Sequence, residues 1–549
     1  MARVVSRVWI GLHLGMALAA MAALTYYLRP WGPWAFTDSV AYVDAARGVL
    51  AGRGLVVRQD PEQTIPLAHY PPLYPLALAA VMGCCRVDWL VAARWIDVAV
   101  YGVFVFVLAE LGRRAWPQQP WVGTLTAAFL AASPVVARNF SGIMTEPMFF
   151  TLIALTMASL WMYWQRAWPG WLRLAGVSAA AAVLTRYAGL FLAPALVLVP
   201  WVGPDRWRRA GLALGPFGLA YGVWNVIMHI RGNTLHFGWP TKSEVLAKTW
   251  ALIQALPEVV WLGWLEMPQG YKRFPYLAWV WVGVTAGLLL VLLVVMGRRG
   301  WMRREAQSDW RIWQVVMLAW GLALAYLAFF YVAFLFRRPE PDFTPRVASP
   351  LFWLMVYGWL WAPFGVIAWI IRTGRRWRHW LGYALGLGYG LVLLGMLYHQ
   401  VWVTKKMLYE LRGYGLGYTA KPWHQPAAWA ELRAWPEEIP LVADEAEALL
   451  LWADRPAYLA NEVMGPVKIY PLGEGPFPYH RAYREGRVAV VHFLPSWPRW
   501  VRLYQHRADE AVDLLFHRRE PCWRNELFEL FYNGSRAAEL CITGERSGP

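Results

Sequence analysis

Long apolar runs alternate with short, arginine-rich links from about residue 8 to about residue 400. Each run reaches the roughly 20 residues that a membrane-spanning helix needs, and we count about eleven of them. The composition agrees, because 58% of the 549 residues are hydrophobic and only 16% are charged, a balance that is not typical of a soluble protein. We therefore predict that residues 1–400 form an all-α polytopic membrane domain of about eleven transmembrane helices.

The first apolar run, Val8 to Leu28, admits two interpretations, a cleaved signal peptide or a retained membrane anchor. It is long, and it ends in Tyr26-Tyr-Leu-Arg29 without a clear small-residue cleavage site. These features favour a retained anchor.

The net charge of +17 raises the question of nucleic acid binding, and the positions of the arginines answer it. If the N-terminus is cytoplasmic, nearly every cytoplasmic link carries a pair or cluster of arginines, as the positive-inside rule requires. The clearest are Arg113 and Arg114; Arg206, Arg208 and Arg209; Arg298, Arg299, Arg303 and Arg304; and Arg372, Arg375, Arg376 and Arg378. We expect a multi-pass protein of the plasma (inner) membrane that contacts membrane lipids and no nucleic acid. Tryptophans such as Trp34, Trp121 and Trp168 lie beside the run ends, where the membrane interface favours them.

About eleven crossings that start inside place the C-terminal region, residues 401–549, outside the cytoplasm. There the apolar runs shorten, and strand-like, helix-like and strand-like segments follow one another at Glu437–Asp444, Glu445–Trp452 and Arg487–Leu494. We predict a small extracytoplasmic α/β domain. Two long outside loops, residues 29–88 and 231–276, precede it.

The four cysteines form two pairs in the sequence. Cys84 and Cys85 lie in an apolar stretch, so we expect packed thiols. Cys522 and Cys541 lie in the exported region and could form a disulfide, which their spacing neither requires nor excludes.

The first outside loop contains a candidate catalytic acid. Asp38 and Tyr42 are four residues apart on one face of a predicted helix, which ends near Gly52-Arg-Gly54 and lies along the membrane. Asp38 could simply be an N-cap or first-turn acid. Alternatively, an acid held just above the bilayer could take a proton from an acceptor hydroxyl, as general-base catalysis needs.

Further polar residues are predicted at the same membrane face. His69-Tyr-Pro-Pro-Leu-Tyr-Pro75 is a rigid, extended entry into a short apolar helix. Glu146, in Thr145-Glu-Pro147, begins the fourth crossing. A lone glutamate at a helix start is often only a favourable dipole partner, but two acids on one face form a better candidate site.

Arg186 ends the fifth crossing and Arg346 lies in an outside link, so both are candidate cations for the same site. A cation near lipid usually has a partner, and arginine is suited to bidentate phosphate contact. An ion pair of Arg186 with Glu146 or Asp97 is the structural alternative. Arg94 and Asp97, one turn apart, could instead pair with each other.

The order of these motifs resembles the GT-C membrane glycosyltransferases. It comprises Asp38-x-x-x-Tyr42, Gly52-Arg-Gly54, Tyr70-Pro-Pro-Leu-Tyr-Pro75, Thr145-Glu-Pro147 and Leu184-Thr-Arg-Tyr-Ala-Gly189. The resemblance covers about the first 200 residues and is greatest to the branch of protein O-mannosyltransferases and lipid A aminoarabinose transferases. It implies a GT-C-like fold, a polyprenyl-phosphate sugar donor, an inverting displacement and Asp38 as the base.

The resemblance also implies roles for the other residues of the site. Glu146 matches a second acidic position and is a candidate catalytic residue, and Arg186 matches the place where relatives carry a basic residue. Arg186 is therefore expected to bind the donor phosphate, and Arg346, from its position in the outside link, is the second candidate cation. Tyr42, His69 and Tyr70 are candidate substrate-binding residues. His69 and Tyr70 stand where the aminoarabinose branch has a Glu-Lys pair, so this chain lacks one phosphate-binding lysine.

The sequence leaves three points open. A divalent metal ion is possible between Asp38 and Glu146, although two carboxylates alone are a weak metal signal. The second long loop, with His236, Lys242, Glu244 and Glu266, is a candidate lid over the site. The acceptor could be a lipid, a glycan or a protein.

Two other functions compete with sugar transfer. A transporter or flippase of lipid-linked sugars would commonly show internal repeats and polar residues at the bilayer midplane, whereas here the charges gather at one face and no repeat is evident. A catalytically silent scaffold whose C-terminal region binds partners is the third possibility.

Overall fold

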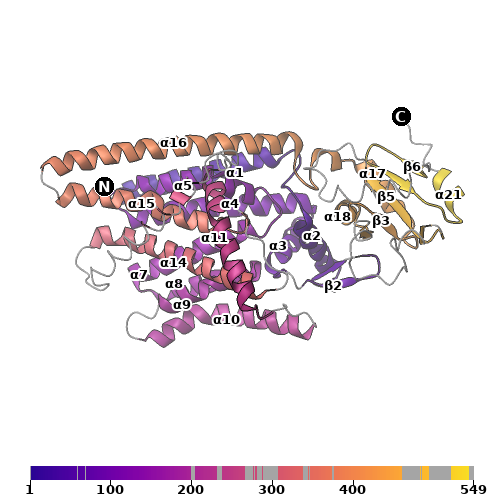
Figure 1. The fold of residues 1–549 in the computed structure, drawn as a ribbon, viewed down its shortest axis with the longest axis horizontal. Coiled ribbons are helices and arrows are strands. Elements are labelled where there is room, and N and C mark those ends of the chain that lie inside the picture. The colour runs from indigo at the N-terminus through magenta and orange to yellow at the C-terminus, as the bar shows by residue number, and fades with distance from the viewer. Residues whose placement is uncertain are drawn as a thin grey trace.

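The computed structural model describes residues 2–58, 60–67, 70–199, 205–231, 238–265, 307–337, 346–373, 376–459, 485–493 and 521–542, with a few single residues between these ranges. Helices dominate these residues and lie roughly along the long axis of the molecule (Figure 1). A small sheet lies at one end of the helix bundle, and the N-terminus lies toward the other (Figure 1). The predicted helical architecture is therefore confirmed, whereas a separate C-terminal α/β domain stays a prediction.

The helices of the bundle follow the apolar runs of the sequence. In chain order they are α1 (Ala2–Leu28), α4 (Trp89–Ala115), α5 (Trp121–Ala132), α6 (Pro134–Phe140), α7 (Glu146–Arg166), α8 (Pro169–Thr185), η1 (Tyr187–Leu192), α9 (Ala193–Leu198), α10 (Arg206–Ile230), α11 (Lys242–Leu265), α14 (Gln307–Phe336), α15 (Ser349–Thr373) and α16 (Arg376–Tyr414). Among the described residues, six helices are long and apolar enough to cross a membrane, namely α1, α4, α7, α10, α14 and α16. A seventh span results if α5 and α6, which meet at a 65° bend, are one broken crossing.

The predicted number of about eleven crossings is therefore met only in part by the described residues. The eighth predicted crossing, near residues 276–297, lies largely outside them. The fifth predicted crossing is the 17-residue helix α8, and the sixth is the shorter apolar segment Tyr187–Leu198. The exact number of crossings stays a prediction.

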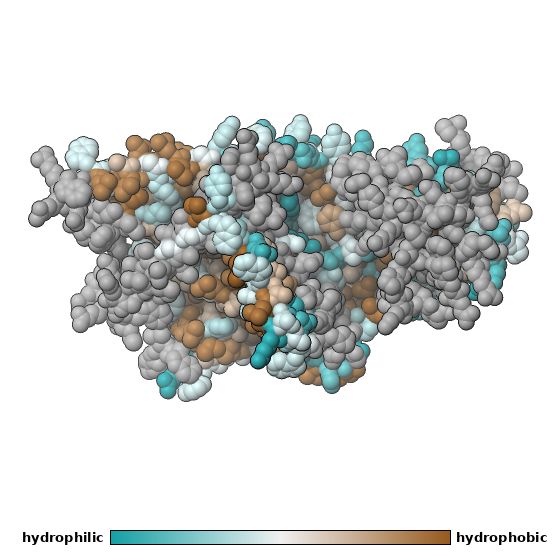
Figure 2. Space-filling model, in the orientation of Figure 1, coloured by the Kyte–Doolittle hydropathy of each residue, from teal (hydrophilic) through white to brown (hydrophobic). Residues whose placement is uncertain are grey.

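The outer surface of the bundle carries apolar patches, as expected of a surface that faces lipid. Figure 2 shows brown apolar side chains on the outside of the helical part. On α16 the exposed side chains include Leu387, Leu391 and Leu394. A soluble protein rarely exposes apolar patches of this extent, so the surface indicates a membrane environment.

The first long loop folds into short elements that lie between the bundle and the sheet (Figure 1). It contains α2 (Thr37–Leu50), a hairpin of β1 (Val56–Arg58) and β2 (Thr64–Pro66), and α3 (Leu73–Cys85). The short apolar helix predicted after the Pro-Pro dipeptide is confirmed as α3. The predicted helix with Asp38 and Tyr42 on one face is confirmed as α2.

The C-terminal part contains a five-stranded sheet in the order β4-β3-β5-β7-β6. Strand β3 is parallel to β4 and β5, whereas β7 is antiparallel to β5 and β6. The strands are β3 (Leu441–Ala443), β4 (Ala457–Leu459), β5 (Ala489–Phe493), β6 (Trp523–Arg524) and β7 (Phe528–Phe531); the helical segments are η2 (Lys421–Trp423), α17 (Pro426–Ala434), α18 (Ala446–Ala448), η3 (Leu449–Ala453) and α21 (Ala537–Ile542). The predicted strand, helix and strand thus contain β3, α18 with η3, and β5. Helix α16 continues past residue 400 to Tyr414, so the predicted domain boundary stays a prediction.

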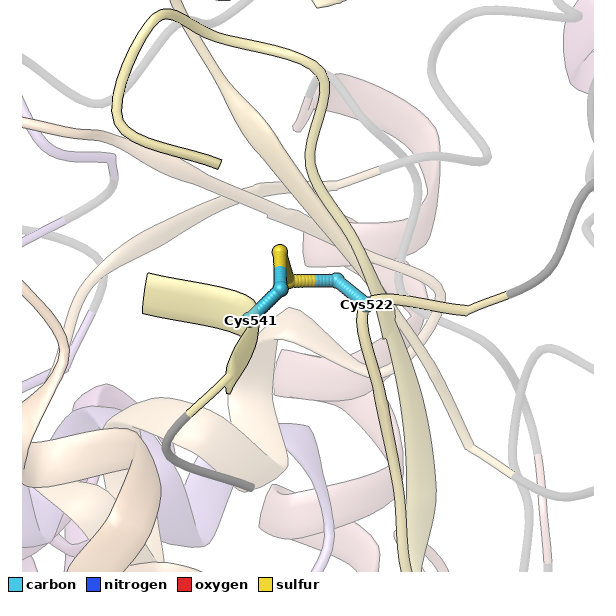
Figure 3. The surroundings of a disulfide bond; sticks show 2 residues. All are labelled: Cys522 and Cys541. Carbon is cyan, nitrogen blue, oxygen red and sulfur yellow. A yellow bond between two sulfur atoms is a disulfide. The ribbon is translucent and has the colours of Figure 1, made fainter. Parts of the chain in front are cut away.

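The disulfide between Cys522 and Cys541, which the sequence neither required nor excluded, is present. Cys522, directly before β6, is bonded to Cys541 on α21, which fastens the last helix to the edge of the sheet (Figure 3). A disulfide restricts the unfolded chain, and bonds of this kind persist in oxidising compartments. The bond is therefore consistent with an exported C-terminal part.

Two expectations about burial are wrong. Cys84 and Cys85 are exposed at the end of α3 rather than packed, because the buried residues of this helix, from Tyr74 to Ala79, all lie in its first half. Trp34, expected at the membrane interface, is only 4% exposed, because its ring packs over Gly142. Apolar composition alone did not distinguish a surface facing lipid from a surface facing protein.

Candidate active site

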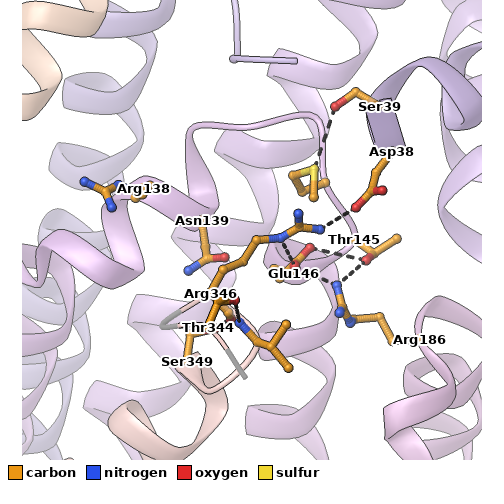
Figure 4. A network of polar contacts seen from close by, with 12 residues as sticks. Asp38, Ser39, Arg138, Asn139, Thr145, Glu146, Arg186, Thr344, Arg346 and Ser349 are labelled. Carbon is orange, nitrogen blue, oxygen red and sulfur yellow. Dashed lines mark hydrogen bonds and ion pairs between the residues drawn. The ribbon is translucent and has the colours of Figure 1, made fainter. Parts of the chain in front are cut away.

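Four charged side chains from distant parts of the sequence meet at the end of the bundle nearest the sheet (Figure 4). Asp38 lies in the first turn of α2, and Glu146 is the first residue of α7. Arg186 lies in the break between α8 and η1, and Arg346 lies in the turn before α15. The structure thus brings both predicted acids and both predicted cations together.

Arg346 bridges the two carboxylates. Its Nη2 lies 2.6 Å from Asp38 Oδ2, and its Nε lies 2.7 Å from Glu146 Oε1. Burial lowers the pKa of Arg346, but the carboxylates of Glu146 and Asp38 outweigh this effect and raise the pKa above its ordinary value. Arg346 therefore carries a permanent positive charge between the two acids.

Arg186 approaches Glu146 from the other side. Its Nη1 lies 2.6 Å from Glu146 Oε1 and donates to Thr145 Oγ1 at 3.0 Å. The backbone of Arg186 is extended, with φ −148° and ψ 135°, so α8 stops there and the side chain turns into the site. The ion pair with Glu146, considered as the structural alternative for Arg186, is therefore present in this structure.

The alternative pairings of Asp97 are wrong. Arg94 Nη1 donates to the carbonyl of Arg29 at 3.3 Å rather than to Asp97. Asp97 is fully buried in α4, and neither of its carboxylate oxygens has a hydrogen-bond partner within the described part of the chain. Spacing of one turn made the Arg94–Asp97 pair possible, but the packing of α4 directs the two side chains apart.

Two tyrosines complete the surroundings of Asp38. The Tyr70 hydroxyl donates to Asp38 Oδ1 at 2.6 Å. Burial and the negative charge of Asp38 raise the pKa of Tyr70, so this hydroxyl keeps its proton and remains a donor. The ring of Tyr42 packs edge-on against Tyr70, with centroids 4.9 Å apart, and forms part of the wall. His69, the third predicted substrate residue, lies outside the described residues.

Backbone hydrogen bonds hold the segment before Asp38 against the segment before Glu146. Trp34 N donates to the Ser141 carbonyl, and Ile143 N donates to the Trp34 carbonyl, each at 2.9 Å. Gly142 lies between these bonds, and a Cβ there would come 2.2 Å from the Trp34 ring. The separation of Asp38 and Glu146 therefore depends on a close approach that only glycine permits.

We expect that Gly142→Ala disrupts this link. The added methyl group must displace the ring of Trp34, and overpacking of this kind costs about 1–3 kcal/mol. A lower thermal unfolding temperature together with weaker transfer activity is the expected result. Gly211→Ala, on the open surface of α10, is the matched control; equal behaviour of the two variants would contradict the structural role of Gly142.

Three of the four charged side chains, Asp38, Arg186 and Arg346, line a cavity of about 530 Å³. Tyr42 and Tyr70 also line it. Several lining residues were not predicted, namely Tyr187, Tyr221, Tyr326, Arg337 and Thr344. Arg337 could have been found, because it directly follows the apolar run of α14 at the same end as Arg346. The tyrosines lie in or beside apolar helices, and the sequence alone does not indicate which helix faces point into the cavity.

The residues do not fit a resident metal ion between Asp38 and Glu146. Arg346 occupies the position between their carboxylates, and the described residues contain no group of three or more His, Cys, Asp and Glu side chains that could hold a metal. A calcium or magnesium site would need several oxygen ligands directed at one point.

Chelation is therefore expected to leave transfer activity within about twofold of the untreated protein, a change equivalent to less than about 0.5 kcal/mol. The measurement compares initial rates after dialysis against EDTA, with and without added Mg²⁺ or Mn²⁺. A large loss that either ion restores would contradict this expectation.

The described part of the second long loop is helical. Helix α11 packs against α14, where Lys248 Nζ donates to the Phe334 carbonyl at 3.2 Å. Lys242 is exposed and Glu244 is partly exposed at its start, whereas His236 and Glu266 lie outside the described residues. Helix α11 thus lies beside the part of α14 that lines the cavity, and its role as a lid stays a prediction.

Comparisons with known proteins agree with the arrangement of the helices. Residues 66–229 match a family model described as dolichyl-phosphate-mannose-protein mannosyltransferase, PMT. The structure is similar to that of ArnT from Cupriavidus metallidurans bound to undecaprenyl phosphate, with a TM-score of 0.56 and 13% sequence identity over 96% of this chain and 99% of that chain. A search of curated proteins found no match.

Two further structures share the fold. One is an oligosaccharyltransferase from Archaeoglobus fulgidus tethered with an acceptor peptide, with a TM-score of 0.50 and 12% identity over 88% of this chain and 69% of that chain. The other is the arabinofuranosyltransferase AftD from Mycobacteria, with a TM-score of 0.50 and 16% identity over 92% of this chain and 37% of that chain. At these identities the likeness concerns the fold, which extends over most of the chain.

Proposed function

We propose that this chain, whose residues 66–229 match the PMT family model and whose fold is shared with GT-C enzymes, is a GT-C glycosyltransferase that uses a polyprenyl-phosphate-linked sugar donor. The sugar passes to an acceptor hydroxyl at the extracytoplasmic face of the membrane, with inversion at the anomeric carbon. Asp38 is the general base, and Arg186 and Arg346 bind the donor phosphate.

One observation carries this proposal. Asp38, Arg186 and Arg346 line a single cavity, and Glu146 holds both arginines through one carboxylate oxygen. A base and two cations within one cavity are the groups that transfer from a phosphate leaving group requires.

The proton of the acceptor passes to Asp38. As the acceptor oxygen attacks the anomeric carbon, Asp38 takes the hydroxyl proton, and the bond between that carbon and the phosphate oxygen breaks. An ionised carboxylate offers about four lone-pair positions, of which Tyr70 and Arg346 use two in this structure. Asp38 is 27% exposed, so an acceptor can reach the remaining positions.

The electrons of the broken bond go to the phosphate oxygen, where negative charge develops. Arginine presents five N–H donors in a fixed fork, so Arg186 and Arg346 can keep a contact to Glu146 while they turn other donors toward a phosphate. Cations positioned at developing charge stabilise the transition state. Glu146 then acts as a positioning residue that holds the two guanidinium groups in place.

The arrangement of charges supports an extracytoplasmic site. Arg113 and Arg114 end α4, and Arg166 ends α7, whereas α7 begins with Glu146 at the charged cluster and α4 begins with Trp89, which packs against Trp452 of the C-terminal part. Arginine clusters mark the cytoplasmic ends of crossings. The cavity and the C-terminal sheet lie at the opposite ends of these helices, which fits the expected cytoplasmic N-terminus in the plasma (inner) membrane.

The proposal is tested with the purified full-length chain in lipid vesicles. A panel of radiolabelled polyprenyl-phosphate sugars is supplied with lipid, glycan and peptide acceptors, and the product is analysed for its anomeric configuration. We expect one donor to give a product of inverted configuration. A product of retained configuration would contradict Asp38 as a simple base.

Two outcomes of the same experiment would favour the rival functions. Movement of labelled donor across the vesicle membrane without any product would indicate a transporter or flippase. Neither movement nor transfer with any donor, although donor and acceptor both bind, would indicate a scaffold.

A further inference from the structure

The C-terminal part of the chain contacts the helix that carries Asp38 at both of its ends. Figure 1 shows α2 between the helix bundle and the sheet. Residues of α2 and of the sheet region also belong to one continuous buried cluster, which includes Val40, Val43, Trp423 and Leu449. The two regions therefore share a hydrophobic core.

Hydrogen bonds from the C-terminal part hold the backbone of the segment that leads into α2. Tyr418 N donates to the Ala35 carbonyl at 2.8 Å, and Thr419 Oγ1 donates to the Pro33 carbonyl at 2.9 Å. Gly417, at φ +60°, allows this approach, because a Cβ there would come 2.1 Å from the Ala35 carbonyl oxygen. The chain three residues before Asp38 is thus paired with the first residues of the C-terminal part.

The first turn of α2 is held by a side-chain contact. Thr37, the neighbour of Asp38, donates its hydroxyl hydrogen bond to Glu447 Oε2 at 3.0 Å. Glu447 lies on α18 and also accepts from the Tyr418 hydroxyl at 2.8 Å. This contact orients the helix beside the proposed base.

The last turn of α2 is held by Arg47. Its Nη1 and Nη2 donate to the carbonyls of Leu450 and Leu451, each at 2.8 Å. These carbonyls belong to η3, where the end of a helical segment leaves carbonyls without partners inside the helix. Arg47 also lies 3.3 Å from Asp454 Oδ1, directly after η3. A single side chain therefore satisfies three acceptors of the C-terminal part.

Arg58 of the hairpin strengthens the same junction. Its Nε donates to Asp44 Oδ1 at 2.9 Å, and its Nη2 contacts Asp454. Asp44 is buried on α2. Asp454 is thereby shared by two arginines, one from α2 and one from β1.

The contacts to the C-terminal part and the cavity lie on different faces of α2. Asp38 and Tyr42 line the cavity, whereas Thr37 and Arg47 contact the C-terminal part. At 100° per residue, positions 37, 44 and 47 form a face apart from positions 38 and 42. Rotation or sliding of α2 would move Asp38 and break the C-terminal contacts together.

We propose that the C-terminal part positions the base, with Arg47 as the principal positioning residue. This inference rests on the proposed role of Asp38. Within the described part of the chain, the hydrogen bonds and ion pair of the Arg47 side chain go to Leu450, Leu451 and Asp454 and to no residue that lines the cavity, so Arg47 acts by holding the end of α2. Misplacement of a reacting group by about 1 Å can cost about 10²-fold in rate, so loss of this anchor affects chemistry more than donor binding.

The test uses Arg47→Ala in the full-length chain, with Arg53→Ala as the matched control. Arg53 is an exposed arginine just beyond the end of α2. We expect kcat to fall by about tenfold or more, within the about 10²-fold range for misplacement, whereas the KM for the donor changes little. Hydrogen exchange of the amides of α2 is expected to become faster, whereas exchange in α4 and α7 stays unchanged.

Two results would overturn the proposal. Unchanged exchange in α2 would show that Arg47 does not hold the helix, and faster exchange with unchanged kcat would show that docking does not position the base. If Arg47→Ala fails to fold, Thr37→Val, which removes one hydrogen bond, is measured in the same way. If the unaltered chain transfers no sugar, the proposed function fails, whereas the exchange measurement still decides whether Arg47 anchors α2.

Discussion

Asp38→Asn is expected to lower the rate of sugar transfer by about 10²–10⁴-fold, the usual contribution of a general base. Asparagine has nearly the same size and can still accept the hydrogen bond of Tyr70, which reaches Asp38 Oδ1 at 2.6 Å. It cannot take a proton from the acceptor at neutral pH. The initial rate with the labelled donor, measured at saturating donor and acceptor, reports this loss.

Glu62→Gln provides the control for this variant. Glu62 is an exposed acid of the same outside loop, so its neutralisation changes the net charge equally without touching the cavity. Thermal unfolding of both variants shows whether each remains folded. Retention of full activity by Asp38→Asn would refute its role as the base and leave it as a first-turn helix acid.

Arg186→Gln is expected to lower kcat by about 10²–10³-fold, the range found when one preformed group that stabilises developing charge is removed. Glutamine can still bond to Thr145 or Glu146 but supplies no positive charge to the leaving phosphate. Arg186→Lys is expected to recover only part of the activity, because a lysine lacks the planar fork of donors. Single-turnover rates with prebound donor separate this effect from donor affinity.

A loss of activity in Arg186→Gln could also result from breaking the ion pair with Glu146 rather than from losing a phosphate ligand. The single variant does not distinguish these two causes. The Nη1–Oε1 distance is 2.6 Å, and removal of one partner of a buried pair is strongly destabilising. The double variant Arg186→Gln with Glu146→Gln removes both charges and relieves that imbalance. If Arg186 binds phosphate, the double variant stays inactive even where stability returns; recovered activity would show a purely structural pair.

The ion pairs of the charged cluster link donor binding to the basicity of Asp38 under the proposed roles of these residues. Two carboxylates, Asp38 and Glu146, face two guanidinium groups, Arg186 and Arg346, so the four charges balance. A phosphate that attracts Arg346 weakens its contact with Asp38 Oδ2 and leaves that oxygen more basic. Under the proposed roles of Asp38 and Arg346, donor binding and activation of the base would be coupled in this way, and proton transfer would be favoured only when the donor is in place.

Much of the local structure follows from residue order. The apolar runs predict the helices because a spanning segment must bury nearly every side chain in lipid or protein. The face shared by Asp38 and Tyr42 follows from helical periodicity, and the short helix after Tyr70-Pro-Pro follows from proline geometry. Because successive crossings alternate in direction, the sequence alone was enough to predict that Asp38, Glu146 and Arg186 lie at one membrane face.

The ion-pair and hydrogen-bond partners of the residues at that membrane face depended on how the helices pack. Arg346 could reach both acids only once the turn before α15 lay against α2 and α7, and Arg94 turned to the Arg29 carbonyl instead of Asp97. The disulfide of Cys522 and the burial of Trp34 likewise required the positions of distant segments. Hydrophobic periodicity is local and can be read along the chain, whereas ion pairs and close backbone approaches join residues whose separation is set by how the helices pack.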